Sequence, residues 1–271
     1  MSNGNPLSKE FFPGTATQHE IDGHELTFTC DNRTALKVFL VSEYIIRFRY
    51  SPDGFFPDDF SYAIDERFQP TQPDFKITES YNFFDIITSK VKCRIYKEGL
   101  RVQISDKKGN VLMEDAERGF HWEENKLFGG YIVQMSKKIQ AQQNFFGLGD
   151  KSTRLNLRGK RLQNWNTDAF GYGPHTDPVY KTVPFYYAHH ANGLYGIFFD
   201  NTYRSFFDFG HENPDTCSFW ANGGEMNYYF IYGEDLLKVG ENYTMLTGTP
   251  ELPPLWSLGF HQCKWSYYPE S

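Results

Sequence analysis

The sequence lacks features that mark membrane, secreted and nucleic-acid-binding proteins. No segment approaches the roughly 18 consecutive apolar residues that cross a bilayer. The first residues lack the basic and apolar regions of a signal peptide. The net charge is −7, and the 27 Lys and Arg residues are scattered rather than gathered into a basic, aromatic stripe. We therefore expect no membrane span and no nucleic-acid partner.

Cysteine is also scarce, and no pattern of metal ligands is present. The four cysteines form no C-x-x-C pair: Cys30, Cys93, Cys217 and Cys263. This favours reduced, mostly buried thiols in a cytoplasmic protein. Adjacent His189 and His190 would point to opposite faces of a strand, so one ion could not readily bind both. The Gly147–Ser152 segment lacks the spacing of a phosphate-binding loop. The sequence indicates no metal and no cofactor.

Aromatic residues, by contrast, are abundant. They make up 18% of the chain, with 26 Phe and 18 Tyr. Aromatic side chains suit the half-buried surface of a pleated sheet, so this excess favours β structure. An aromatic core is the simpler explanation for any single ring. Stacking on the C–H face of a sugar is the alternative.

The period of the apolar residues predicts antiparallel strands. Between Phe83 and Met113, three alternating runs are separated by turn signals at 97–99 and 106–110. Turns at this spacing are typical of a sandwich or barrel. Further strands are predicted within Leu36–Tyr50, at Gly193–Phe199 and at Met226–Tyr232. The first twenty residues predict a polar arm.

One helix is predicted, over residues 234–247. Its apolar positions are spaced by three, four and three: Leu236, Val239, Tyr243 and Leu246. Gly248 and Pro250 follow as stop signals. A Pro-Pro break then leads into an apolar segment, which we interpret as a strand near Ser257–Cys263.

Residues 141–190 are rich in Gly, Asn, Asp and aromatics without periodicity. Long irregular segments in compact domains are usually functional or disordered, and the aromatic content argues against disorder. Asp168 lies among these aromatics, where its carboxylate could accept hydrogen bonds from two sugar hydroxyls. From the residues alone, a turn-stabilising role is equally consistent. The acidic pairs Asp58-Asp59 and Glu123-Glu124 predict solvated surface rather than catalytic groups.

Four stretches together resemble glycoside hydrolase family 31, the α-glucosidase and α-xylosidase family. They are Phe146-Gly-Leu-Gly-Asp150, residues 155–160 with 165–168, residues 177–185 with 195–201, and residues 246–248 with 252–267. Their order and spacing carry the resemblance, whereas residues 1–140 match only in their all-β character.

The resemblance implies an all-β fold, an antiparallel β-sandwich of the galactose-mutarotase-like kind. We expect this domain at residues 1–249, including the helix and a substrate loop near 150–185. Residues 250–271 would be a linker and the first strand of an incomplete (β/α)8 barrel. Such a barrel takes about 250 residues. The family's two catalytic aspartates lie on later barrel strands, so we expect no catalytic residue in this chain and no activity from it alone.

The resemblance also implies two substrate-binding residues. Asp168 matches a residue that contacts the sugar on the leaving-group side, and Trp265 matches a residue that lines the sugar pocket. The predicted function is the N-terminal part of a retaining, exo-acting α-glucosidase that hydrolyses terminal α-linked glucose. Its partners would be the oligosaccharide and the missing barrel in cis. The alternatives are α-xylosidase or α-galactosidase specificity, and a stand-alone carbohydrate-binding β-sandwich. The linker and barrel strand favour the enzyme, because a binding module needs neither.

Overall fold

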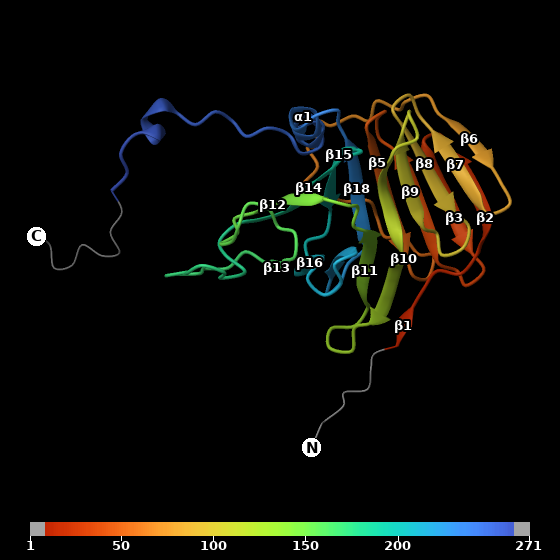
Figure 1. Cartoon of the computed structure of the whole chain (residues 1–271), viewed down its shortest axis with the longest axis horizontal. Coiled ribbons are helices and arrows are strands. Elements are labelled where there is room, and N and C mark those ends of the chain that lie inside the picture. Colours follow the sequence, from red (N-terminus) through yellow and green to blue (C-terminus); the bar gives the residue numbers. More distant parts are fainter. Residues whose placement is uncertain (1–8, 263–271) are drawn as a thin grey trace, which may run out of the picture.

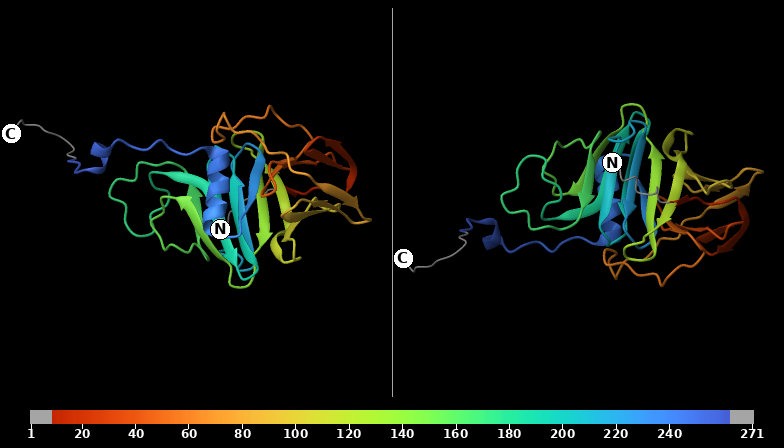
Figure 2. Two further views of the ribbon diagram at one scale, coloured as in Figure 1. Left: turned by 90° about the horizontal axis from the view of Figure 1, so that it is seen from above. Right: turned by 90° about the horizontal axis from the view of Figure 1, so that it is seen from below.

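The computed structural model describes residues 9–262 and is built from two facing β-sheets. Figures 1 and 2 show the sheets stacked on each other, and the helix packs on the outer face of the eight-stranded sheet. Every strand pair in this range is antiparallel. The predicted all-β sandwich is confirmed.

The first sheet has ten strands. In spatial order they are β13 (Arg161–Asn164), β16 (Ser205–Phe209), β17 (Thr216–Ala221), β11 (Tyr131–Lys138), β10 (Val111–Glu124), β9 (Val102–Asp106), β8 (Val91–Tyr96), β7 (Phe83–Ile87) and β6 (Lys76–Glu79), with β1 (Glu10–Phe11) paired to β10. The predicted meander between Phe83 and Met113 is present as β7, β8, β9 and the start of β10.

The second sheet has eight strands. In spatial order they are β12 (Asn144–Gly149), β14 (Thr182–His190), β15 (Gly193–Phe199), β18 (Met226–Tyr232), β5 (Ile45–Ser51), β4 (Ala35–Leu40), β3 (Glu25–Cys30) and β2 (Ala16–Asp22). The bounds of β15 and β18 are those predicted. The predicted polar arm is wrong for residues 10–11 and 16–20, because β1 pairs with β10 and the edge strand β2 pairs with β3.

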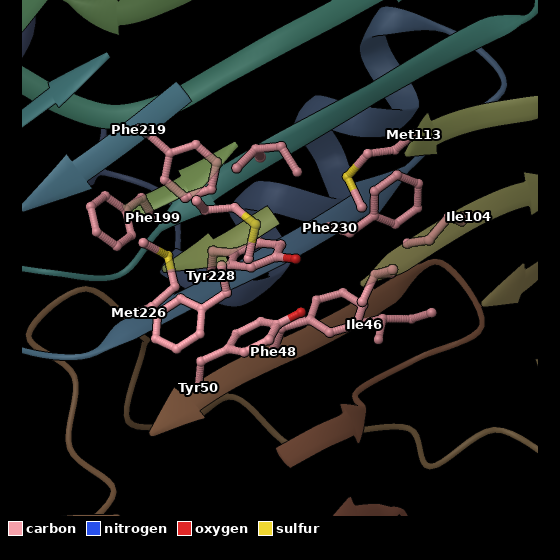
Figure 3. Close-up of a cluster of buried hydrophobic side chains, with 14 of the residues drawn as sticks. Ile46, Phe48, Tyr50, Ile104, Met113, Phe199, Phe219, Met226, Tyr228 and Phe230 are labelled. Atoms are coloured by element: carbon pink, nitrogen blue, oxygen red, sulfur yellow. The ribbon is translucent and has the colours of Figure 1, made fainter. Parts of the chain in front are cut away.

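The core between the sheets is largely aromatic (Figure 3). Phe48 of β5 stacks on Tyr228 of β18, with their ring centres 5.1 Å apart. The ring centre of Phe199 lies 5.2 Å from that of Phe219 in the opposite sheet. All four side chains are fully buried. Large rings fill the space between sheets and remove much apolar surface from water. This packing accounts for much of the aromatic excess.

The outer face of β5 is also buried, although Arg47 and Arg49 lie on it. Nη1 and Nη2 of Arg47 donate to Asp59 at 2.7 Å, and Arg49 donates to Glu225. The fork geometry pairs each charge with a carboxylate. The prediction that Asp58 and Asp59 lie on the solvated surface is confirmed, since both are exposed, although Asp59 also pairs with a buried arginine.

Helix α1 (Leu236–Thr247) matches the predicted 234–247 closely and lies against β15 and β18. Asp235 caps it by accepting a hydrogen bond from the Lys238 N–H at 2.8 Å. Val239 and Leu246 are fully buried, as predicted, whereas Leu236 is 54% exposed. The helix therefore packs on its central and C-terminal turns.

The segment expected to be a barrel strand differs in its described part. A single 3-10 turn, η1 (Leu255–Leu258), occupies its start, residues 259–262 form no strand, and Cys263 lies outside the described residues. The Ser257 N–H donates to the Pro254 carbonyl, and the Gly259 N–H to the Trp256 carbonyl. Strand backbone groups need a neighbouring strand, and none lies alongside here within residues 9–262 (Figure 1). Local turns satisfy some of these groups instead.

Candidate functional site

The predicted substrate loop extends from the end of the sandwich formed by β12 and β13, the edge strands of the two sheets (Figure 1). Residues 150–160 connect β12 to β13, and residues 165–181 connect β13 to β14. Two long connections therefore leave the same end of the molecule.

Gly149 marks the point where the chain leaves β12. Its φ is +77°, and a Cβ there would lie 2.7 Å from the Lys181 carbonyl oxygen. Only glycine allows β12 and β14 to approach so closely at this angle. The next residue, Asp150, donates its N–H to the same carbonyl at 2.8 Å, which closes the base of the loop.

A partly buried ion pair ties the two connections to the free edge of β13. Lys151 Nζ lies 3.1 Å from Asp177 Oδ1 and donates to the Gln163 carbonyl at 2.5 Å. Asp177 Oδ2 accepts the Gln163 N–H at 2.5 Å. Burial lowers the pKa of Lys151, and the nearby Asp177 acts in the opposite direction. We call this arrangement the Lys151–Asp177 clamp. It satisfies the backbone of an edge strand and fixes both connections against it.

Further hydrogen bonds order the 165–181 connection. Asn166 Oδ1 accepts both the N–H and the hydroxyl of Thr182 at 2.9 Å. The Thr167 N–H donates to the Val179 carbonyl at 3.2 Å, and Ser152 Oγ donates to the Gly173 carbonyl at 2.7 Å. The connection is thus irregular in backbone but held at many points.

Asp168 lies on the exposed part of this connection. Among the described residues, none hydrogen-bonds to its carboxylate or pairs with it. The turn-stabilising alternative therefore has no hydrogen bond to support it, and the carboxylate is available to a ligand. Trp265, the other predicted binding residue, lies outside the described residues.

Two hollows lie beside the loop. One, of about 720 Å³, is lined by residues that include 150–154, Tyr172 and Tyr180. The other, of about 530 Å³, lies between the sheet edges and is lined by residues that include Asn164, Trp165 and Tyr203. The Trp165 ring is 43% exposed, and the Arg204 guanidinium lies 4.9 Å from its centre. Exposed rings and polar groups thus surround the loop.

Three of the four cysteines can be placed, and all three are free and buried. Burial raises the pKa of Cys30 and of Cys217 to about 12. Such thiols are poor nucleophiles at neutral pH. The predicted buried thiols are confirmed at Cys30, Cys93 and Cys217, while Cys263 lies outside the described residues.

Within residues 9–262, no three His, Cys, Asp or Glu side chains converge in a way that could hold a metal ion. The same range contains no helix long and apolar enough to cross a membrane.

Three residues of this region had no role in the sequence interpretation: Lys151, Asp177 and Asn164. Asp177 begins the Asp-Pro-Val-Tyr segment that contributes to the family resemblance, and this was the one available signal. The sequence pattern around Lys151 and Asn164 gives no such signal, because the groups that surround them belong to separate strands.

The fold and the loop agree with a comparison against protein families. Residues 35–208 match the glycosyl hydrolase 31 N-terminal galactose mutarotase-like domain. The chain therefore belongs to glycoside hydrolase family 31, as its motifs predicted.

Individual relatives come from the same family. The chain is 32% identical over 248 residues to alpha-glucosidase 2 of Bacillus thermoamyloliquefaciens, covering 91% of this chain and 30% of that protein. It is 38% identical over 117 residues to alpha-xylosidase XylQ of Lactiplantibacillus pentosus, covering 43% of this chain and 15% of that protein.

Among solved structures, the chain resembles the GH31 dextranase of Flavobacterium johnsoniae complexed with isomaltotriose. The TM-score is 0.83 at 35% identity, covering 92% of this chain and 30% of that one. The chain thus spans less than a third of the length of these relatives.

Proposed function

We propose that this chain is the N-terminal part of a longer, retaining, exo-acting α-glycosidase that removes terminal α-linked glucose. In this proposal the sandwich presents the 165–181 connection as one wall of the substrate site, and Asp168 binds the sugar on the leaving-group side. The catalytic carboxylates lie on a barrel domain in cis.

The exposed, unpaired carboxylate of Asp168 on a clamped loop carries the proposal. An ionised carboxylate accepts strong hydrogen bonds from hydroxyl groups. Because the clamp and the Asn166–Thr182 bonds hold the base of the loop, binding would cost little ordering of the chain. The likeness to an α-glucosidase over 91% of the chain supports the enzyme class.

In this proposal the sandwich binds substrate and a separate barrel domain carries out catalysis. A retaining glycosidase needs two carboxyl groups roughly 5–5.5 Å apart on either side of the glycosidic bond. The family places both on the barrel, so the 271-residue chain alone should be inactive. The 30% coverage of the relatives supports a longer parent protein.

A related specificity is the second candidate. The match to an α-xylosidase has 38% identity, although over less than half of this chain. Assays of the longer enzyme on p-nitrophenyl α-glucoside and α-xyloside distinguish the two, and we expect the glucoside to give the higher kcat/KM.

An activity assay of the isolated chain tests whether catalysis requires the barrel domain. We expect the longer enzyme to hydrolyse p-nitrophenyl α-glucoside and the 271-residue chain to be inactive. Turnover by the short chain would contradict the proposal. Tight binding of maltose by the short chain would instead favour a stand-alone carbohydrate-binding sandwich, because one wall of a pocket should bind weakly.

Replacing Asp168 by Ala in the longer enzyme tests the binding role. We expect kcat/KM on disaccharides to fall by the equivalent of about 1–3 kcal/mol, because hydrogen bonds to a charged group are lost. The matched control is Asp74→Ala, since Asp74 is also exposed but lies outside the loop. Equal kcat/KM in the two variants would remove Asp168 from the site.

A further inference from the structure

Asn164, the last residue of β13, has an unusual environment. Its side chain is buried, with the residue only 5% exposed, and neither Oδ1 nor Nδ2 has a hydrogen-bond partner. Thr153 Oγ1 is the one other buried side-chain atom in residues 9–262 without a partner. Buried amides are almost always hydrogen-bonded, because leaving them unpaired is costly. An amide with both a donor and an acceptor unused therefore points to a missing partner.

The position of the Asn164 side chain indicates where that partner would lie. Within β13, Leu162 and Asn164 are buried while Arg161 is exposed, so Asn164 lies on the inner side of the sheet. It lines the 530 Å³ hollow, together with Val183, Pro184 and Phe198 of the opposite sheet. The amide thus lies where the space between the two sheets opens to the outside.

Two other polar side chains of the same hollow, Asp200 and Asn201, already have partners. Asp200 accepts hydrogen bonds from Ser61 and Asn227, and the Asn201 amide donates to the Gly223 and Glu225 carbonyls. A sugar would bring several hydroxyls, each of which needs a partner when buried. The hollow offers an unpaired planar donor and acceptor side by side, and Val183, Pro184 and Phe198 are among its lining residues. This pattern suits a polypeptide better than a carbohydrate.

In an extended polypeptide the N–H and C=O of one residue point to the same side. A side-chain amide can bond to both at once. An apolar side chain next to that residue would fill the space beside Phe198 and Pro184. The rim supplies further apolar surface, because Tyr62 is 82% exposed and Tyr203 is 54% exposed. Exposed apolar surface beside a hollow is typical of sites where a protein segment or a ligand binds.

We propose that Asn164 and this hollow, here named the Asn164 socket, receive an extended segment from the rest of the longer polypeptide. One residue of that segment gives its N–H and C=O to the Asn164 amide, and a neighbouring apolar side chain fills the hollow. The inference rests on the proposed function, since it needs a longer chain. The relatives, of which this chain covers 30%, make such a segment available in cis.

The test compares Asn164→Leu in the 271-residue chain and in the longer polypeptide, with the melting temperature as readout. In the short chain we expect the Tm to stay the same or rise, because an unpaired amide is removed. In the longer polypeptide we expect it to fall by a few degrees, because the docked segment loses both hydrogen bonds. Asn164→Ala, which cannot clash, should repeat the difference between the two forms.

Asn82→Leu is the matched control. Asn82 is exposed and lies before β7, near the opposite edge of the same sheet from β13. It should change the Tm of both forms equally. The same Tm change for Asn164→Leu in both forms would overturn the socket. Binding of isomaltotriose by the short chain that Asn164→Leu abolishes would also overturn it, in favour of a sugar.

The test of the Asn164 socket is independent of the test of the proposed function. The melting temperature can be measured without turnover, so it tests the socket even if the longer polypeptide fails to hydrolyse p-nitrophenyl α-glucoside. In that case the enzyme proposal fails, while a fall in Tm in the longer polypeptide alone still supports the socket.

Discussion

Two buried lysine–aspartate pairs lie in different regions of this protein, and their surroundings differ. In the core, Lys137 Nζ lies 2.7 Å from Asp115 Oδ1, and the two side chains are 1% and 0% exposed. At the loop, Lys151 Nζ lies 3.1 Å from Asp177 Oδ1, and the side chains are 4% and 19% exposed. The first pair is enclosed between the sheets, whereas the second lies where the sandwich meets the substrate loop.

The remaining hydrogen bonds of each pair explain the difference. Lys137 also donates to the Tyr228 hydroxyl of the opposite sheet, and Asp115 accepts the Val102 N–H. Burial raises the pKa of Asp115, and Lys137 acts against that rise. The core pair thus joins the two sheets at a desolvation cost. The loop pair bonds instead to the backbone of Gln163, so it positions a loop. The same two residue types therefore hold the two sheets together in one region and position a loop in the other.

The largest expected effect is in the core. Lys137→Met should lower the free energy of unfolding by about 3–5 kcal/mol, because Asp115 is left buried without its cation. Adding Asp115→Leu should recover part of the loss, although the Val102 N–H then lacks its acceptor. Urea denaturation of the single and double variants measures both values.

Lys138→Met, on the same strand, is the control for the core pair. Lys138 pairs with Glu114 but its side chain is 48% exposed, so we expect a change within about 0.5 kcal/mol. A loss for Lys137→Met no larger than for Lys138→Met would contradict the distinction between the pairs.

A smaller effect is expected at the loop. Lys151→Met should cost about 1–3 kcal/mol, because the Gln163 carbonyl loses a partner and Asp177 loses its cation. Amide hydrogen exchange should become faster over residues 165–181 while the central strands stay protected.

Lys181→Met is the control for the loop, since Lys181 is an exposed lysine of the same connection. It should leave hydrogen exchange unchanged. If Lys151→Met speeds exchange throughout the sandwich, the clamp is part of the core and the two regions are not distinct.

The smallest effect concerns two buried histidines of the sandwich. Burial lowers the pKa of His121, on the strand of Asp115, and of His190, on the strand after the loop. The His190 ring also contacts the Leu112 carbonyl at 2.9 Å. The folded state therefore favours the neutral rings, so stability should be full above the unfolded pKa of about 6.5 and be lost as the pH falls toward the lower, folded values.

The expected slope is at most about 1.4 kcal/mol per pH unit for each histidine. Urea denaturation at pH 7.5 and 5.5 measures it, and His121→Gln or His190→Gln should each reduce the difference. His189→Gln is the control, because that neighbour is exposed. A free energy of unfolding that rises as the pH falls would contradict this prediction.

Local pattern was sufficient for the strands with clear alternation and for the helix. The β15 and β18 strands and helix α1 follow from periodicity, since each needs only one apolar face and a stop signal. The alternation in β5 placed Phe48 on a buried face but gave no sign that Arg47 would also be buried. Its partner Asp59 comes from an irregular segment, and such pairing leaves no period in the sequence. The interpretation of residues near 257–263 as a strand went beyond local pattern, because a strand also needs a neighbour.

By itself, the sequence determined the two-sheet architecture, the family and the exposed Asp168 loop as a candidate site. These depend on residue spacing within single segments and on motifs read in order. Only the tertiary structure decided that Lys151 and Asp177 clamp the edge of β13 and that the Asn164 amide is buried without a partner. Each of those properties depends on hydrogen bonds between strands that are distant in sequence, and no single segment encodes them.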